Sequence, residues 1–189
     1  MAGAKRPVIL NGAGVVLGGA IPASMALAER LTAPVCVGYQ HNDAFPGSHP
    51  LSVGPLGYNG SKAAMKLIAQ ADVVLALGTR LNPFSTLPGY GIDYWPKTAD
   101  IIQVDINSDR IGLTKDVTVA IQGDAKKVAQ QLLARLARMR GCTVIGTAGL
   151  SFLVGTEPVI ATVMMQGVMV NSSVSSCAVR PYSRLTDVM

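Results

Sequence analysis

Residues 56–81 read LGYNGSKAAMKLIAQADVVLALGTRL, residues 101–112 read IIQVDINSDRIG, and residues 117–133 read VTVAIQGDAKKVAQQLL. The apolar runs and helical spacings predict a helix, a strand ending at Gly78, a strand ending at Asp105, a strand ending at Gly123 and a last helix. Parallel strands bring their carboxyl ends to one edge of a sheet, where α/β proteins bind ligands. We therefore expect an edge that carries glycine, arginine and aspartate residues.

The first part of the chain repeats this alternation of strand and helix. Residues 7–10 and 34–37 are predicted strands, and residues 11–14 form a glycine turn before a helix with apolar residues at 21, 25, 28 and 31. Residues 38–56 and 82–97 are predicted long loops. The expected fold is α/β: a doubly wound, mostly parallel sheet of about five to six strands with helices on both faces, of the Rossmann-like kind.

Composition limits the function classes. The chain has 189 residues, 49% of them hydrophobic, which is enough for one domain. Its 16 Lys and Arg residues are spread along the chain without forming a run, so we expect no nucleic-acid partner. Cys36, Cys142 and Cys177 are an odd number without CxxC spacing, which argues against a zinc site and predicts a reducing compartment, the cytoplasm. The apolar run that begins at Pro7 is too short for a signal peptide.

Residues 139–189 break the pattern. Between Gly141 and Val179 the single charged residue is Glu157, and no period of 2 or 3.6 persists. Glu157 and Pro158 divide the apolar stretch into pieces shorter than the ~18–20 residues that span a bilayer, so we expect no membrane span. We predict a domain at residues 1–138 and an irregular tail that is not a native part of it.

Two glycine-containing segments are candidates for binding a phosphate. Gly12, Ala13 and Gly14 follow a strand and precede a helix, which lets backbone amides approach an anion. The alternative is that these glycines serve only close packing. Gly78, Thr79 and Arg80 follow the buried strand, and the arginine fork suits a phosphate or a carboxylate. The alternative is that Arg80 forms a salt bridge to Asp105 or Asp124.

The other candidates follow the later strands. Asp105 and Asn107 could hydrogen-bond ribose or ribityl hydroxyls, or cap the turn before Arg110. Gly123 and Asp124 follow the last strand, and Asp124 is also a good helix N-cap. No acidic residue ends the second strand, which disfavours an NAD-dependent dehydrogenase.

The two long loops carry histidines and aromatic residues. His41 and His49 have no partner motif, so we expect them to be solvated or bonded within their loop. Tyr90, Tyr94 and Trp95 could stack on a ligand ring, but we favour a domain interface because such large rings are poorly placed in water.

Residues 5–137 resemble the central domain of thiamine diphosphate-dependent enzymes. The matching phrases are Gly12-Ala13-Gly14, ADVV (residues 71–74) leading to GTRL (residues 78–81), QVDIN (residues 103–107), Ile111-Gly112 and Gly123-Asp124-Ala125. Within that family, LGYNGSKAAM (residues 56–65), LGTRLNPFSTLPGYGIDYWPK (residues 77–97) and QVDINSDRIGLTK (residues 103–115) are most similar to the sulfoacetaldehyde acetyltransferase branch. That branch converts sulfoacetaldehyde and phosphate to acetyl phosphate and sulfite.

The resemblance implies thiamine diphosphate and magnesium in a parent enzyme, with sister domains and subunits of a homo-oligomer as partners. In the family a Glu of one domain activates the thiamine and a GDG…N motif of another holds the diphosphate and magnesium. This chain has no GDG, and its glutamates are Glu29 and Glu157. We therefore expect no catalytic residue and no metal ligand here. Some relatives hold FAD or ADP at positions that match Gly12, Arg80 and Asp105; for this branch an empty cleft is favoured.

Three function classes remain open at the level of sequence. The first is a fragment of a thiamine-dependent acyl-transferring enzyme that is inactive alone. The second is a free-standing FAD- or ADP-binding module, and the third is an NAD-dependent hydride-transfer enzyme. Ligand binding that depends on Arg80 would distinguish the second from the first.

Overall fold

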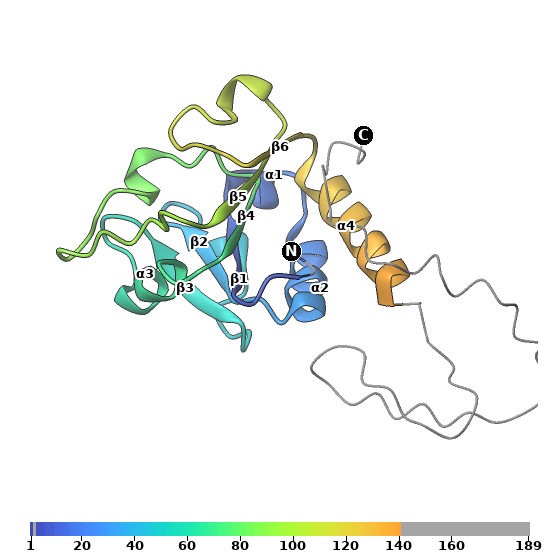
Figure 1. Ribbon diagram of the computed structural model, residues 1–189, viewed down its shortest axis with the longest axis horizontal. Coiled ribbons are helices and arrows are strands. Elements are labelled where there is room, and N and C mark those ends of the chain that lie inside the picture. Colours follow the sequence, from blue (N-terminus) through green and yellow to red (C-terminus); the bar gives the residue numbers. More distant parts are fainter. Residues whose placement is uncertain (2, 141–189) are drawn as a thin grey trace, which may run out of the picture. The chain divides into compact units, whose positions relative to one another are not determined.

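The computed structural model describes residue 1 and residues 3–140, drawn in colour in Figure 1. The low-charge tail that we predict at residues 139–189 lies outside the described residues except for the end of one helix. The domain boundary at residue 138 therefore stays a prediction.

Six strands form one sheet in which every neighbouring pair is parallel, in the order β3-β2-β1-β4-β5-β6. The strands are β1 (Pro7–Asn11), β2 (Val35–Gly38), β3 (Ser52–Leu56), β4 (Val73–Leu77), β5 (Asp100–Asp105) and β6 (Val119–Gln122). The connections turn in opposite directions from β1 and from β4, so a topological switch point lies between these two strands. The doubly wound fold predicted from the sequence is confirmed.

Strand β3 corrects one prediction, since the sequence pattern assigned residues 38–56 to a loop. Its sequence SVGPL contains Gly54 and Pro55, residue types that are rare in strands. Proline is tolerated on an edge strand, where one side of the backbone has no partner. The register of β3 against β2 shifts between Val35 and Cys36, which accommodates this irregular strand.

The helices are α1 (Ala13–Leu17), α2 (Ile21–Leu31), α3 (Lys62–Ile68) and α4 (Ala125–Arg140), and short 3-10 turns are η1 (Asn42–Ala44), η2 (Pro83–Ser85) and η3 (Ser108–Arg110). The sequence predicts one helix after the glycine turn, whereas the structure has two. Gly19 separates α1 from α2 with a φ of 59°, a backbone conformation that glycine adopts readily. Pro22 lies in the first turn of α2, as expected.

Helices cover both faces of the sheet (Figure 1). On one face Leu27 of α2 and Val128 of α4 pack with alternate strand residues such as Ile9 and Leu75. On the other face Met65 and Ile68 of α3 pack with the intervening strand residues. Both faces of the central strands are therefore buried, which explains why these strands read as continuous apolar runs.

Within the described part of the chain, no helix is both long enough and apolar enough to cross a bilayer. The apolar stretch considered from the sequence as a membrane span, residues 141–179, lies outside the described residues.

Candidate functional site

All ten residues predicted to bind a cofactor lie at the carboxyl ends of β1, β4, β5 and β6 or in the segments that follow them. These residues are Gly12, Ala13, Gly14, Gly78, Thr79, Arg80, Asp105, Asn107, Gly123 and Asp124. The parallel sheet brings these segments to a single edge, next to the switch point between β1 and β4. Their hydrogen bonds show which of them remain available to a ligand.

The glycine turn after β1 is joined directly to the end of β4. Gly12 donates its backbone N–H to the carbonyl of Leu77 over 3.0 Å, and Gly14 donates to the carbonyl of Gly78 over 2.8 Å. A Cβ atom added to Gly14 would lie 2.8 Å from the Cα atom of Gly78. The glycines therefore permit two backbones to cross at close range, and two amides of the turn are engaged within the protein. This geometry favours the packing role over phosphate binding.

The turn after β4 places Arg80 between two residues in left-handed conformations. Gly78 has a φ of 58°, and the buried Leu81 has a φ of 52°, which is unusual for a branched side chain. The backbone N–H of Leu81 donates to Oγ1 of Thr79 over 3.2 Å. Burial of Leu81 holds the turn in this conformation, and the side chain of Arg80 is exposed.

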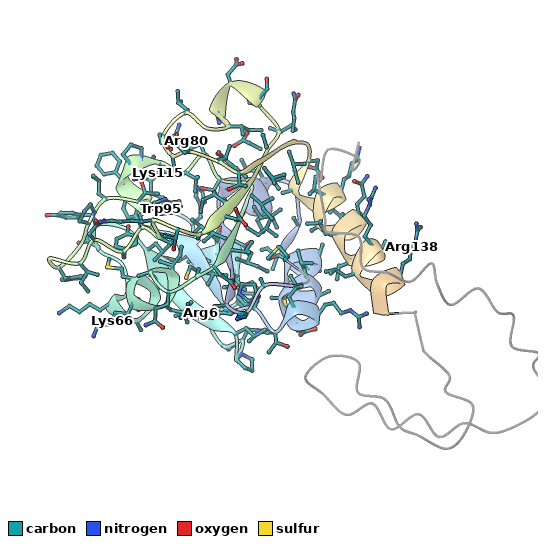
Figure 2. The ribbon with its side chains drawn as sticks, viewed as in Figure 1. Arg6, Lys66, Arg80, Trp95, Lys115 and Arg138 are labelled. Atoms are coloured by element: carbon teal, nitrogen blue, oxygen red, sulfur yellow. The ribbon has the colours of Figure 1, made fainter. Side chains whose placement is uncertain are left out.

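Arg80 makes no salt bridge within the described residues. The ion pairs there are His41–Asp43, His49–Glu29 and Lys97–Asp93, so the predicted alternative, a bridge from Arg80 to Asp105 or Asp124, is not formed. Figure 2 shows Arg80 in the same region of the domain as Lys115 and Trp95. Thr114 holds this turn in place, because its hydroxyl donates to the carbonyl of Leu81 over 2.7 Å and lies 3.2 Å from the carbonyl of Arg80.

Asp105 and Asn107 take the capping role that the sequence left open. Oδ1 of Asp105 accepts the backbone N–H of Asn107 over 2.9 Å, and Oδ1 of Asn107 accepts the N–H of Asp109 over 2.9 Å. Asn107 is thereby the N-cap of η3. Short polar side chains that bond to their own backbone in this way stabilise turns.

Gln103 is a residue that sequence reasoning missed. It is buried in β5, and its Nε2 donates to the carbonyls of Thr79 over 3.0 Å and Arg110 over 3.2 Å. Its Oε1 accepts the N–H of Gly112 over 2.9 Å. One amide side chain therefore joins the turn after β4 to the turn after β5. A glutamine inside the apolar run IIQV was the signal, because a buried amide must find hydrogen-bond partners.

Gly123 and Asp124 connect β6 to α4. The N–H of Gly123 donates to the carbonyl of Asp105 over 3.0 Å, and Oδ1 of Asp124 accepts the N–H of Lys127 over 3.0 Å. The N-cap role expected for Asp124 is thus observed. Its other oxygen, Oδ2, lies 3.2 Å from where a Cβ on Gly18 would be, so the end of α1 meets the start of α4.

The loop of residues 82–97 contacts the segments at the carboxyl ends of β2 and β3. The carbonyl of Phe84 accepts the N–H of Tyr58 over 3.2 Å, and Oγ of Ser85 lies 3.5 Å from where a Cβ on Gly38 would be. Gly38 ends β2, where a Rossmann dehydrogenase places the acid that binds ribose. Here that position faces a buried serine, which supports the sequence argument against an NAD site.

The aromatic residues of this loop divide between core and surface. Tyr94 is completely buried in the core next to α3, and its hydroxyl donates to the carbonyl of Ser85 over 3.0 Å. Burial raises the pKa of Tyr94 to about 12. The expectation that Tyr94 would lie at a domain interface is therefore wrong. Trp95 is partly buried under Lys115, and Tyr90 is 57% exposed.

The expectation that the histidines would be solvated or bonded within their loop holds only in part, because His49 also bonds to Glu29 of α2. Nε2 of His49 lies 3.1 Å from Oε1 of Glu29, and its Nδ1 accepts the N–H of Leu51 over 3.2 Å. His49 thereby ties the loop after β2 to α2. Nδ1 of His41 lies 3.8 Å from Asp43.

The described residues do not fit thiamine diphosphate with magnesium. No group of three or more His, Cys, Asp or Glu side chains within them could hold a metal ion. The acids at the carboxyl edge are engaged in capping turns, and the amides of Gly12 and Gly14 are bonded to β4. At this edge, the side chain of Arg80 is available to a ligand or a partner. The loops around it carry exposed aromatic and aliphatic side chains.

The comparisons with known proteins agree with this arrangement. Residues 1–132 match the family model "Thiamine pyrophosphate enzyme, central domain". A solved structure of a thiamin diphosphate-dependent enzyme isolated from Mycobacterium smegmatis superposes with a TM-score of 0.56 at 28% identity, over 72% of this chain and 25% of that one.

Among curated proteins, a "Probable sulfoacetaldehyde acetyltransferase" of Rhizobium meliloti (strain 1021) is 82% identical over 138 residues, 73% of this chain and 23% of the relative. A "Sulfoacetaldehyde acetyltransferase" of Castellaniella defragrans is 61% identical over 140 residues, 74% of this chain and 23% of the relative. An "Acetolactate synthase" of Mycobacterium bovis is 35% identical over 136 residues, 72% of this chain and 22% of the relative. The chain thus spans about a quarter of the length of the proteins that it matches.

Proposed function

This chain belongs to the thiamine pyrophosphate enzyme family, as its central domain, and from that premise we propose that it is the central domain of a sulfoacetaldehyde acetyltransferase. The parent enzyme would convert sulfoacetaldehyde and phosphate to acetyl phosphate and sulfite, in the cytoplasm, as a homo-oligomer. The observation that carries the proposal is the 82% identity over 138 residues with a relative of that name. The identity with an acetolactate synthase, at 35%, is much lower.

The chain's own part in this reaction is structural. Thiamine diphosphate supplies the carbanion chemistry when it is bound, and magnesium would anchor its diphosphate. We assign both to other parts of the parent enzyme, because the described residues offer no metal-binding group and the sequence has no GDG motif. The 189-residue chain alone should therefore be inactive.

A chimera tests this proposal. Residues 1–138 would replace the matching segment of the Rhizobium meliloti relative, and acetyl phosphate formation from sulfoacetaldehyde would be measured. We expect the chimera to retain activity and the 189-residue chain alone to have none. The matching segment of the Mycobacterium bovis acetolactate synthase serves as the control insert. A folded chimera without activity, or turnover by the chain alone, would contradict the proposal.

Binding of FAD or ADP is the second candidate function, because Arg80 is exposed and has no ion-pair partner among the described residues. The engaged amides of Gly12 and Gly14 weigh against it. A thermal-shift titration of the 189-residue chain with each ligand separates the two functions. A ligand at 100 times its dissociation constant adds about 2.7 kcal/mol of stability. We expect no shift; a shift that disappears in Arg80→Ala would instead support a nucleotide-binding domain.

A further inference from the structure

The exposed large apolar side chains of the described residues gather at one edge of the sheet. All of them lie in segments that follow the carboxyl end of a strand: Leu17, Tyr58, Phe84, Leu87, Tyr90, Ile106 and Leu113. The outer surfaces of α2, α3 and α4 contribute none to this set. Single exposed apolar residues are ordinary, but their confinement to one edge marks an interaction surface.

Five side chains, Tyr39, Tyr58, Phe84, Leu87 and Tyr90, form what we call the aromatic edge. The ring centroids of Tyr39 and Phe84 lie 6.3 Å apart, and the backbone of Tyr58 is hydrogen-bonded to that of Phe84. These contacts join the loops after β2, β3 and β4. Phe84 is 56% exposed and Tyr58 is 69% exposed, so the joined loops present their rings outward.

The backbone beneath the aromatic edge is fixed by hydrogen bonds. Oδ1 of Asn82 accepts the N–H of Phe84 over 2.9 Å, and the N–H of Leu87 donates to the carbonyl of Pro83 over 2.7 Å. Tyr94 anchors the same turn to the core through the carbonyl of Ser85. Aromatic side chains on an ordered backbone lose little freedom when they are covered, which is the property of an interface anchor.

Tyr90 occupies a strained position at the tip of the loop. It has a φ of 54° and is followed by Gly91 with a φ of 71°, between the bridged residues Gly89 and Ile92. A tight turn of this kind favours Asn or Gly at the position that Tyr90 occupies. The ammonium group of Lys62 lies 4.7 Å from the centre of the Tyr90 ring. No ion pair joins Lys62 to an acid within the described residues.

We propose that the aromatic edge is the docking surface for a neighbouring domain of the parent enzyme. The surface of that neighbouring domain would be apolar and would place a carboxylate opposite Lys62. This inference rests on the proposed function. The relatives carry about three quarters of their length outside the region matched here, and the matched model is a central domain, so polypeptide is available to cover this edge. Tyr and Phe are the residues enriched in the cores of such interfaces.

Hydroxyl-radical footprinting of Phe84 and Tyr58 tests the inference in the 189-residue chain and in the chimera described above. We expect both side chains to be oxidised at least about ten times more slowly in the chimera than in the chain alone. Tyr94 is the internal control, because it is buried in this domain and should be protected in both. Equal oxidation in the two proteins overturns the inference. If the two side chains become more protected from oxidation as the concentration of the chain alone increases, the inference is also overturned, because a second copy of this chain would then cover the aromatic edge.

Variants provide a second measurement. Tyr58→Ser combined with Phe84→Ser should lower the unfolding temperature of the chimera by at least about 2 °C more than that of the chain alone. Gln130→Ser is the control, since Gln130 is exposed on α4, whose outer surface contributes no residue to the exposed apolar set. An unchanged chimera overturns the inference. Acetyl phosphate formation by the unsubstituted chimera tests the proposed function separately. A chimera that is active but leaves the rings of Tyr58 and Phe84 exposed would overturn the docking inference and leave the proposed function in place.

Discussion

Gly14 donates its backbone N–H to the carbonyl of Gly78 over 2.8 Å, and the two residues approach more closely than any side chain would allow. This contact joins the turn after β1 to the turn after β4, the two strands at which the sheet reverses its winding. A glycine pattern that suggests phosphate binding in sequence thus serves close packing in the structure.

Gly14→Ala should destabilise the domain. The new methyl group would lie 2.8 Å from the Cα atom of Gly78, and backbone atoms cannot move aside as a flexible side chain can. Overpacking of this kind costs about 1–3 kcal/mol. Urea unfolding measures the change, and Gly47→Ala is the control because no atom lies within 4 Å of its added Cβ. Equal stability of the two variants would contradict the packing role.

Gln103→Leu should destabilise the domain although leucine is similar in size. The substitution removes the hydrogen-bond partners of Thr79, Arg110 and Gly112 in a buried site. We expect a loss of about 2–3 kcal/mol in the free energy of unfolding. Gln122→Leu is the matched control, since Gln122 is exposed and makes one bond of 3.5 Å. Its effect should stay within about 0.5 kcal/mol.

Asp72 should contribute stability that depends on pH. Burial opposes its ionisation, but the N–H groups of Lys5 and Arg6, at 2.6 Å and 3.0 Å, lower its pKa below the ordinary 3.8. A folded-state pKa below the unfolded value stabilises the protein above the unfolded pKa of about 3.9, and this contribution is lost as the pH falls through the folded pKa.

The measurement is urea unfolding of the natural chain and of Asp72→Asn between pH 7 and pH 3. The difference in stability between the two should be constant above about pH 5 and shrink below about pH 4. Asp116→Asn, at an exposed residue, is the control. A difference that stays the same down to pH 3 would show that the two backbone bonds do not favour the ionised carboxylate.

Cys36 should be unreactive in the folded protein. Burial raises the pKa of its thiol to about 12, and the thiolate is the reactive form. In a variant with Cys142→Ser and Cys177→Ser, a small thiol reagent should modify Cys36 only at the rate at which the domain opens. Added urea should accelerate the reaction steeply. Rapid modification without urea would contradict the buried position of Cys36 in β2.

Sequence reasoning predicted the alternation of strands and helices well because the central strands are buried on both faces. Runs such as VVLAL at β4 and IIQV at β5 are typical of strands that are buried on both faces of a parallel sheet, and both strands are confirmed. The resemblance to thiamine enzymes is also confirmed by the matched family model. Strand β3 is not predicted because Gly54 and Pro55 are residue types that rarely occur in strands. The break between α1 and α2 is not predicted because the sequence interpretation does not treat the glycine pair at residues 18 and 19 as a helix end.

The candidate site was less predictable, since strand-end residues can serve a ligand or the fold. The sequence places Asp105, Asn107 and Asp124 correctly at the carboxyl edge, but only the folded structure shows their side chains capping turns. The role of Gln103 depends on two loops that are brought together by tertiary structure. Cofactor binding by the ten predicted residues stays a prediction.

Strand β3 ends the sheet on one side with a residue that cannot extend it. Pro55 has no backbone N–H, and its carbonyl already accepts the N–H of Ser61 over 2.7 Å. An incoming strand would find neither a donor nor a free acceptor at this point. This edge of the sheet is thereby poorly suited to the addition of foreign strands, which would otherwise seed aggregation during folding.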